Sequence, residues 1–100
     1  MRKIAFIINP VSGTGNKDAI ERHISRHFGQ AAGFETLLYA TRCAGDGCEQ
    51  ARRFARQGLD AVVAVGGDGT INEVARGLLH TSTAMGIVPV GSGNGLARHL

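Results

Sequence analysis

A strand-to-helix turn holds the residues best suited to chemistry in this chain of 100 residues. Three glycines and one carboxylate stand side by side, at Gly66, Gly67, Asp68 and Gly69, directly after an apolar run at residues 61–65. Glycines allow backbone N–H groups to approach a ligand closely, and a helix N-terminus presents free N–H groups with a partial positive charge. The turn therefore predicts a site that holds the phosphates of a nucleotide.

Four apolar segments predict the strands that must position this turn. They span residues 3–9, 34–40, 60–65 and 86–90. The first is apolar without interruption from Ile4 to Ile8, which is typical of a strand buried on both faces of a parallel sheet. The second is less apolar, and Pro89 stands inside the fourth, so we expect these two strands near the sheet edges.

Helical patterns alternate with the strands. The first begins at Asn16 or Asp18 and carries an apolar stripe at Ile20, Ile24 and Phe28. The inward faces of the next two consist of Ala51, Phe54, Ala55 and Leu59, and of Ile71, Val74, Ala75 and Leu78.

Two sequence patterns predict how the second and third helices begin. Asp46 with Glu49, and Thr70 with Glu73, have the spacing of a capping box. Gly58 is placed to end the second helix. On this prediction Thr70 and Glu73 stabilise the helix end, and Asp68 is left without a structural task.

The alternation of strands and helices predicts an α/β fold. We expect a doubly wound, mostly parallel sheet with helices on both faces. The last helical pattern, residues 96–100, is too short to form a helix alone. We therefore expect residues 1–100 to be an N-terminal nucleotide-binding domain that is truncated before its end.

The loops that follow the strands should share one rim, because the carboxyl ends of parallel strands lie along the same sheet edge, where such folds bind ligands. These loops span residues 9–16, 41–47, 66–70 and 91–95, and three of them are rich in glycine. Neither the Gly-x-Gly-x-x-Gly dinucleotide motif nor the Walker motif occurs in them. The rim therefore predicts a nucleotide crevice of another kind.

Composition narrows the classes of partner. A net charge of +3 suits an anionic ligand or surface, while the absence of Trp and a single Tyr argue against nucleic acid as a partner. Cys43 and Cys48 have the spacing of neither a zinc pair nor a redox motif. The apolar start of the chain is too short for a signal peptide or a membrane span, so we expect a cytoplasmic protein.

Three motifs resemble the diacylglycerol kinase catalytic-domain family, which includes bacterial lipid kinases and sphingosine kinases. They are Asn9-Pro10-x-Ser12-Gly13, Gly66-Gly67-Asp68-Gly69-Thr70-x-Asn72-Glu73-Val74 and Pro89-x-Gly91-Ser92-Gly93-Asn94-x-Leu96-Ala97, in the family's order and spacing. The second motif is shared with NAD kinases and, more loosely, phosphofructokinases, so the last one favours a lipid kinase. Ser92 and Gly95 depart from the Gly-Thr-x-Asn-Asp of many members and resemble the sphingosine kinase side. The family's second, β-rich domain is not contained in these residues.

The resemblance implies transfer of the γ-phosphate of ATP, with Mg²⁺, to a diacylglycerol-like or sphingosine-like hydroxyl at a membrane surface. Asp68 would be the catalytic general base, or would bind Mg²⁺ directly or through water. Asn72 and Glu73 would not touch the nucleotide but would support the residues that contact it. The residues expected to border the nucleotide are Asn9, Ser12, Gly13, Thr41, Gly66, Gly67, Gly69, Thr70, Gly91, Ser92, Gly93 and Asn94.

Two other functions remain open. One is an NAD kinase-like or other small-molecule kinase, and the other is a nucleotide-binding module without catalysis. Because the lipid site needs the second domain, we expect the 100-residue piece alone to be inactive. A lipid kinase would also be located peripherally, at the inner membrane surface. The apolar segment at residues 88–100 leaves open a homo-oligomer formed through this edge.

Overall fold

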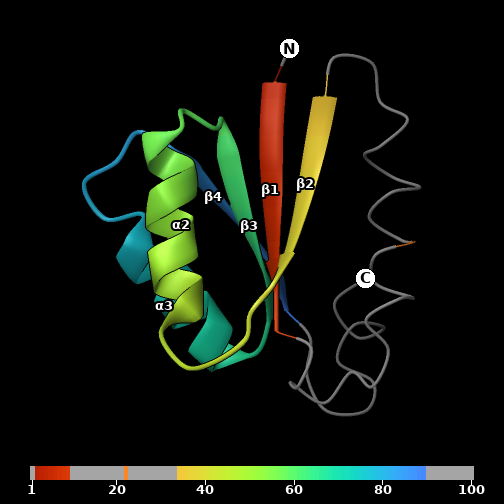
Figure 1. Cartoon of the computed structure of the whole chain (residues 1–100), viewed down its shortest axis with the longest axis vertical. Helices are drawn as coiled ribbons and strands as arrows, with labels where there is room; N and C mark the ends of the chain where they lie inside the picture. The colour runs from red at the N-terminus through yellow and green to blue at the C-terminus, as the bar shows by residue number, and fades with distance from the viewer. Residues whose placement is uncertain (1, 10–21, 23–33, 90–100) are drawn as a thin grey trace.

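A computed structural model describes residues 2–9, 22 and 34–89 of the chain. Its four strands form one parallel sheet in the order β2-β1-β3-β4, and the helices α2 and α3 lie on one face of it (Figure 1). The strands are β1 (Arg2–Ile8), β2 (Phe34–Ala40), β3 (Ala61–Gly66) and β4 (Ala84–Pro89). The helices are α2 (Asp46–Arg56) and α3 (Asp68–Gly77).

The parallel α/β sheet flanked by helices confirms the predicted fold class. As predicted, β2 and β4 are the outer strands of the described sheet. The predicted start of the fourth strand at residue 86 is wrong, because Ala84 and Met85 already pair with Ala61 and Val62 of β3. The first helical pattern, at residues 16–28, and the short one at residues 96–100 lie outside the described residues.

Strand β1 is buried on both faces, as its uninterrupted apolar sequence predicted. Ala5 and Ile7 face α2 and α3, whereas Phe6 and Ile8 belong to a second cluster on the opposite face. All four of these side chains are at most 1% exposed. Because side chains alternate across a strand, such complete burial requires cover on both sides of the sheet.

The helices bury one apolar face each against β1 and β3. From α2 come Ala51 and Phe54, and from α3 comes Val74, all of which are buried in the cluster that contains Ala5 and Ile7. As predicted, Gly58 terminates α2: it follows the C-cap residue Gln57 and has a φ of +82°. The Gly58 N–H donates to Ala55 O at 3.1 Å and the Leu59 N–H to Phe54 O at 3.3 Å, which together form a Schellman motif.

A close contact near the end of α3 sets the distance between the two helices. A Cβ atom added at Gly77 would meet the backbone carbonyl oxygen of Cys48, and it would lie 2.9 Å from the Cβ atom of Ala51. Both of these neighbours belong to α2, and a backbone carbonyl cannot move aside as a flexible side chain can. Only a residue without a side chain therefore allows α2 and α3 to pack this closely.

Replacing Gly77 by Ala should lower the free energy of unfolding by about 1–3 kcal/mol, because the added methyl group overpacks the contact between the helices. Urea unfolding monitored by circular dichroism would measure the change. Arg76→Ala, at the exposed neighbouring position, is the control and should stay within about 0.5 kcal/mol of the native chain. Equal stability of Gly77→Ala and the native chain would contradict the contact.

Candidate functional site

The order in which strands are added to the sheet switches sides between the parallel strands β1 and β3, and this point marks where a ligand is expected. These strands are neighbours in the sheet, but the chain continues from β1 to β2 on one side and from β3 to β4 on the other. Ligands of open α/β sheets bind at such a switch point, outside the carboxyl ends of the strands. Asn9 follows β1 there, and its N–H donates to Val65 O at 3.3 Å, which joins the ends of the two strands.

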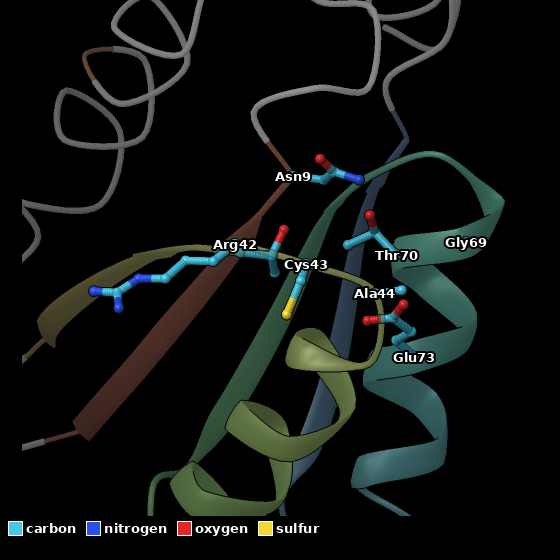
Figure 2. Close-up of a pocket in the computed structure, with 8 residues that line it drawn as sticks. Asn9, Arg42, Cys43, Ala44, Gly69, Thr70 and Glu73 are labelled. Carbon is cyan, nitrogen blue, oxygen red and sulfur yellow. The ribbon is translucent and has the colours of Figure 1, made fainter.

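A pocket of about 280 Å³ opens at this point (Figure 2). It lies between the segment after β2 and the first turns of α3. Its lining residues are Asn9, Thr41, Arg42, Cys43, Ala44, Gly69, Thr70 and Glu73. Figure 2 shows Asn9 at the head of the pocket, Thr70 and Glu73 on the α3 side, and the Arg42 guanidinium pointing away. The pocket volume approaches the lower end of the range for ligand sites.

Helix α3 presents its N-terminus to this pocket, and no side chain in the described part of the chain caps it. Its N-cap is Gly67, with extended backbone angles and no side-chain capping hydrogen bond. The first backbone bond of the helix runs from Ile71 N to Gly67 O, at 3.0 Å. The N–H groups of the preceding first turn therefore have no partner within the helix, and they add to its positive end.

Packing requires glycine at one position around the start of α3 but not at two others. A Cβ atom at Gly66 would lie 2.9 Å from the Oγ1 atom of Thr70, so packing requires glycine there. At Gly67 and Gly69 a Cβ atom would meet nothing within 4 Å. Because Gly67 has a negative φ and Gly69 lies in the helix, neither position needs glycine for its backbone conformation. Open space at these two positions is what the approach of a ligand to the backbone would need.

The predicted capping box at Thr70 and Glu73 is wrong. Thr70 lies inside α3, and its side chain is 95% buried against Gly66 rather than bonded to the helix end. Glu73 reaches across to the start of α2, where its Oε2 accepts from Gly45 N at 3.0 Å and its Oε1 from Gly47 N at 2.9 Å. The Glu73 carboxylate, which the capping-box pattern assigned to the start of α3, therefore bonds to the start of α2 instead.

The predicted capping box at Asp46 and Glu49 is also wrong. The N-cap of α2 is Gly45, whose φ of +87° favours glycine and which contributes no side-chain capping bond of its own. Asp46 instead accepts from Arg42 N and from the Tyr39 hydroxyl, each at 2.8 Å at its Oδ2 atom. Asp46 therefore ties the segment after β2 back to the end of that strand.

This contact changes the titration of Tyr39. The hydrogen bond to Asp46 raises the pKa of the Tyr39 hydroxyl, with desolvation and the negative charge of Asp46 as further causes. A phenolate would lose the bond and face a carboxylate. The contact is therefore made by the neutral form of Tyr39.

Several predicted site residues do meet in the pocket. Asn9, Thr41, Gly69, Thr70 and Glu73 line it. Those beside it without lining it are Gly66, Gly67, Asp68 and Asn72, of which Asp68 and Asn72 are exposed. The predicted residues Ser12, Gly13, Gly91, Ser92, Gly93 and Asn94 lie outside the described residues.

Three lining residues were missed by the sequence prediction. Arg42, Cys43 and Ala44 follow Thr41 directly. Their position after a parallel strand was the signal, because a loop at that edge lines the rim with consecutive residues. The sequence prediction placed the whole 41–47 loop at the rim but named only Thr41 from it as a site residue.

Carboxylates near the pocket do not gather into a metal-binding cluster. Within the described ranges, no group of three or more His, Cys, Asp or Glu residues could hold a metal ion. Asp68 stands alone as the first residue of α3. In the same residues, no helix is long and apolar enough to cross a membrane.

Comparisons with known proteins agree with the geometry. The family model of the diacylglycerol kinase catalytic domain matches residues 3–100. A diacylglycerol kinase of Bacillus subtilis (strain 168) is 39% identical over the whole chain, which covers 33% of that protein. A crystal structure of a diacylglycerol kinase from Bacillus anthracis str. Sterne matches 99% of this chain and 36% of its own, with a TM-score of 0.70 and 29% identity. A phosphate-loop protein in solution matches with a TM-score of 0.64 at 19% identity, which shows the fold alone.

The chain belongs to the diacylglycerol kinase catalytic domain family, which is a family of kinases. It spans about a third of the length of the curated relatives it matches.

Two substitutions should distinguish Gly66, where packing requires glycine, from Gly69, where a side chain has room. Gly66→Ala should lower the free energy of unfolding by about 1–3 kcal/mol, because its methyl group meets Thr70. Gly69→Ala should raise it by up to about 1 kcal/mol, because alanine favours the helix and has room. Thermal unfolding of both variants beside the native chain would measure the signs. An equal loss of stability in both variants would contradict this distinction between Gly66 and Gly69.

Replacing Tyr39 by Phe should cost about 0.5–1 kcal/mol at pH 7, since one partly exposed hydrogen bond to Asp46 is lost. Because the folded-state pKa of Tyr39 is raised, its contribution is fully present below the unfolded pKa, about 10, and is lost as pH rises through the folded value. Urea unfolding of both proteins from pH 7 to 11 should therefore show the difference shrinking only above about pH 10. A difference that is constant across this range would contradict the bond.

Proposed function

We propose that this chain forms the ATP-binding part of a lipid kinase that transfers the γ-phosphate of ATP to a lipid hydroxyl. The observation that carries the proposal is the N-terminus of α3, which no side chain among the described residues caps and which stands beside a pocket at the switch point of the sheet. Gly67 and Gly69 leave open space next to its backbone. An anion with several oxygens, such as a polyphosphate, fits this arrangement of donors.

The described residues would bind different parts of the nucleotide on two walls of the pocket. The backbone N–H groups of Gly67, Asp68 and Gly69 would bind phosphate oxygens on the α3 side. Asn9 and Thr41 would border the remainder of the nucleotide. Because 280 Å³ is small for a whole nucleotide, the loops expected to contain Ser12, Gly13 and residues 91–94 would complete the site.

Asp68 fits the way in which Mg²⁺ is bound by phosphate-transferring proteins. Mg²⁺ is held there by one or two carboxylates together with substrate phosphates and water, rather than by a cluster of protein ligands. One exposed carboxylate beside a phosphate site matches that pattern. Bound Mg²⁺ would neutralise charge that develops on the phosphates. Asp68 would hold the ion directly or through water, or would accept the proton of the attacking hydroxyl.

The lipid acceptor is supported by the family and by relatives that are diacylglycerol kinases. A diacylglycerol-like acceptor follows from those relatives, and a sphingosine-like acceptor from the resemblance of the last motif. Such an acceptor is met at a membrane surface, so a peripheral location accompanies the proposal. A small-molecule acceptor such as NAD is the competing outcome of the test.

Two assays test the proposal. In the 100-residue chain, calorimetric titration should detect ATP binding, and Gly69→Ala should weaken it about tenfold, since its methyl group stands where phosphate would approach. In the full-length gene product, labelled phosphate should pass from ATP to diacylglycerol or sphingosine in mixed micelles, and Asp68→Ala should reduce this transfer at least about 100-fold. Glu49→Gln, an exposed change of one charge on α2, is the matched control and should retain transfer. Transfer to NAD alone, or near-native transfer by Asp68→Ala, would overturn the corresponding part of the proposal.

A further inference from the structure

Glu73 connects two segments of the rim that are far apart in the sequence. Its carboxylate projects from the second turn of α3 and accepts the N–H groups of Gly45 and Gly47 at 3.0 Å and 2.9 Å. We call these two contacts the Glu73 bridge. Both amides belong to the N-terminus of α2, since Gly45 is the N-cap and Gly47 lies in the first turn. Figure 2 shows Glu73 lying between α3 and the segment around Ala44.

The bridge makes the two helix N-termini at the rim electrically different. At α2, a carboxylate is bonded to two amides and offsets the positive end of the helix dipole. At α3, no side chain among the described residues bonds to the first-turn amides, and Asp68 in that turn is exposed. Among the described residues, an anion that reaches the pocket therefore meets one helix end whose amides are bonded to a carboxylate and one whose amides are not.

The bridge also fixes the width of the pocket. Ala44 on one wall is next to Gly45, and Thr70 on the other wall stands one turn before Glu73 on α3. A side chain at position 47 would press on the bridge, because a Cβ atom there would lie 2.8 Å from Glu73 Oε1. With glycine at position 47, one carboxylate can accept both amides at normal hydrogen-bond distances.

We infer that Glu73 is a positioning residue: it holds the 41–47 loop against α3 and, by occupying the amides of α2, directs the phosphates of the ligand to the N-terminus of α3. This inference rests on the proposed function for the identity of the ligand. It assigns to Glu73 no contact with the reacting atoms. The bridge itself consists only of contacts within the chain, so it can be tested without the lipid.

The test compares Glu73→Gln with the native chain and with Glu49→Gln, which removes the same charge from the first turn of α2 without touching the bridge. Amide hydrogen exchange by NMR should find Gly45 and Gly47 protected in the native chain and in Glu49→Gln, and exposed in Glu73→Gln. Inorganic pyrophosphate should shift the amide signals of Gly67, Asp68 and Gly69 in the native chain. In Glu73→Gln it should shift those of Gly45 and Gly47 as well.

ATP binding provides the link to function. Glu73→Gln should weaken ATP binding by the 100-residue chain about tenfold, because the released 41–47 loop no longer holds its wall of the pocket, while Glu49→Gln leaves binding unchanged. In the full-length gene product, the same change should raise KM for ATP and alter kcat less than threefold. That split follows when binding is weakened equally in the ground and transition states.

Failure of the inference and failure of the proposed function are distinguishable. Unprotected Gly45 and Gly47 amides in the native chain, or the same pyrophosphate pattern in native chain and Glu73→Gln, would overturn the inference even if ATP binds. Absence of ATP binding by the native chain would overturn the proposed function and with it the assignment of the ligand. If Glu73→Gln does not fold, Gly47→Val gives the same test, because its side chain displaces the carboxylate while Glu73 keeps its charge.

Discussion

The structure depends on the burial of residues 5–8 of β1 on both faces of the sheet. This strand is hydrogen-bonded to a parallel partner along each edge and supplies side chains to both clusters of the core, one on each face of the sheet. Parallel pairing on both sides also forces the chain to leave β1, β2 and β3 at one edge of the sheet. The loops at that edge are brought together by the core, not by contacts with a ligand.

The rim then combines residues that serve the fold with residues that the fold does not need. Gly66 and Gly77 are required by close packing, and Asp46 and Glu73 hold the segment after β2 in place. Gly67 and Gly69 meet no such requirement. A glycine inside a helix destabilises it by up to about 1 kcal/mol relative to alanine, so its presence at position 69 suggests a demand from outside the chain itself.

The elements were predictable from the sequence because their signals are local and redundant. An uninterrupted apolar run predicts a buried parallel strand wherever it occurs, and Gly58 ends α2 by a backbone motif of a few residues. The helix starts were not predictable in the same way. Glu73 stands three residues after Thr70, which satisfies the local pattern, but its carboxylate bonds to amides 26 and 28 residues away. Only the tertiary packing of α2 on α3 decides between these partners. The bond between Asp46 and Tyr39 likewise joins two elements, the start of α2 and the end of β2, and is not part of a helix-start pattern.

The attachment of the 41–47 loop has a thermodynamic consequence for any ligand that enters the pocket. Thr41 N is bonded to Ile8 O, Arg42 N to Asp46, and the amides of Gly45 and Gly47 to Glu73. Ordering a free backbone residue costs about 1–2 kcal/mol of conformational entropy, and here that loss has already occurred during folding. Binding along this wall would therefore carry little entropy penalty from the loop, and most of its favourable contacts would appear directly as affinity.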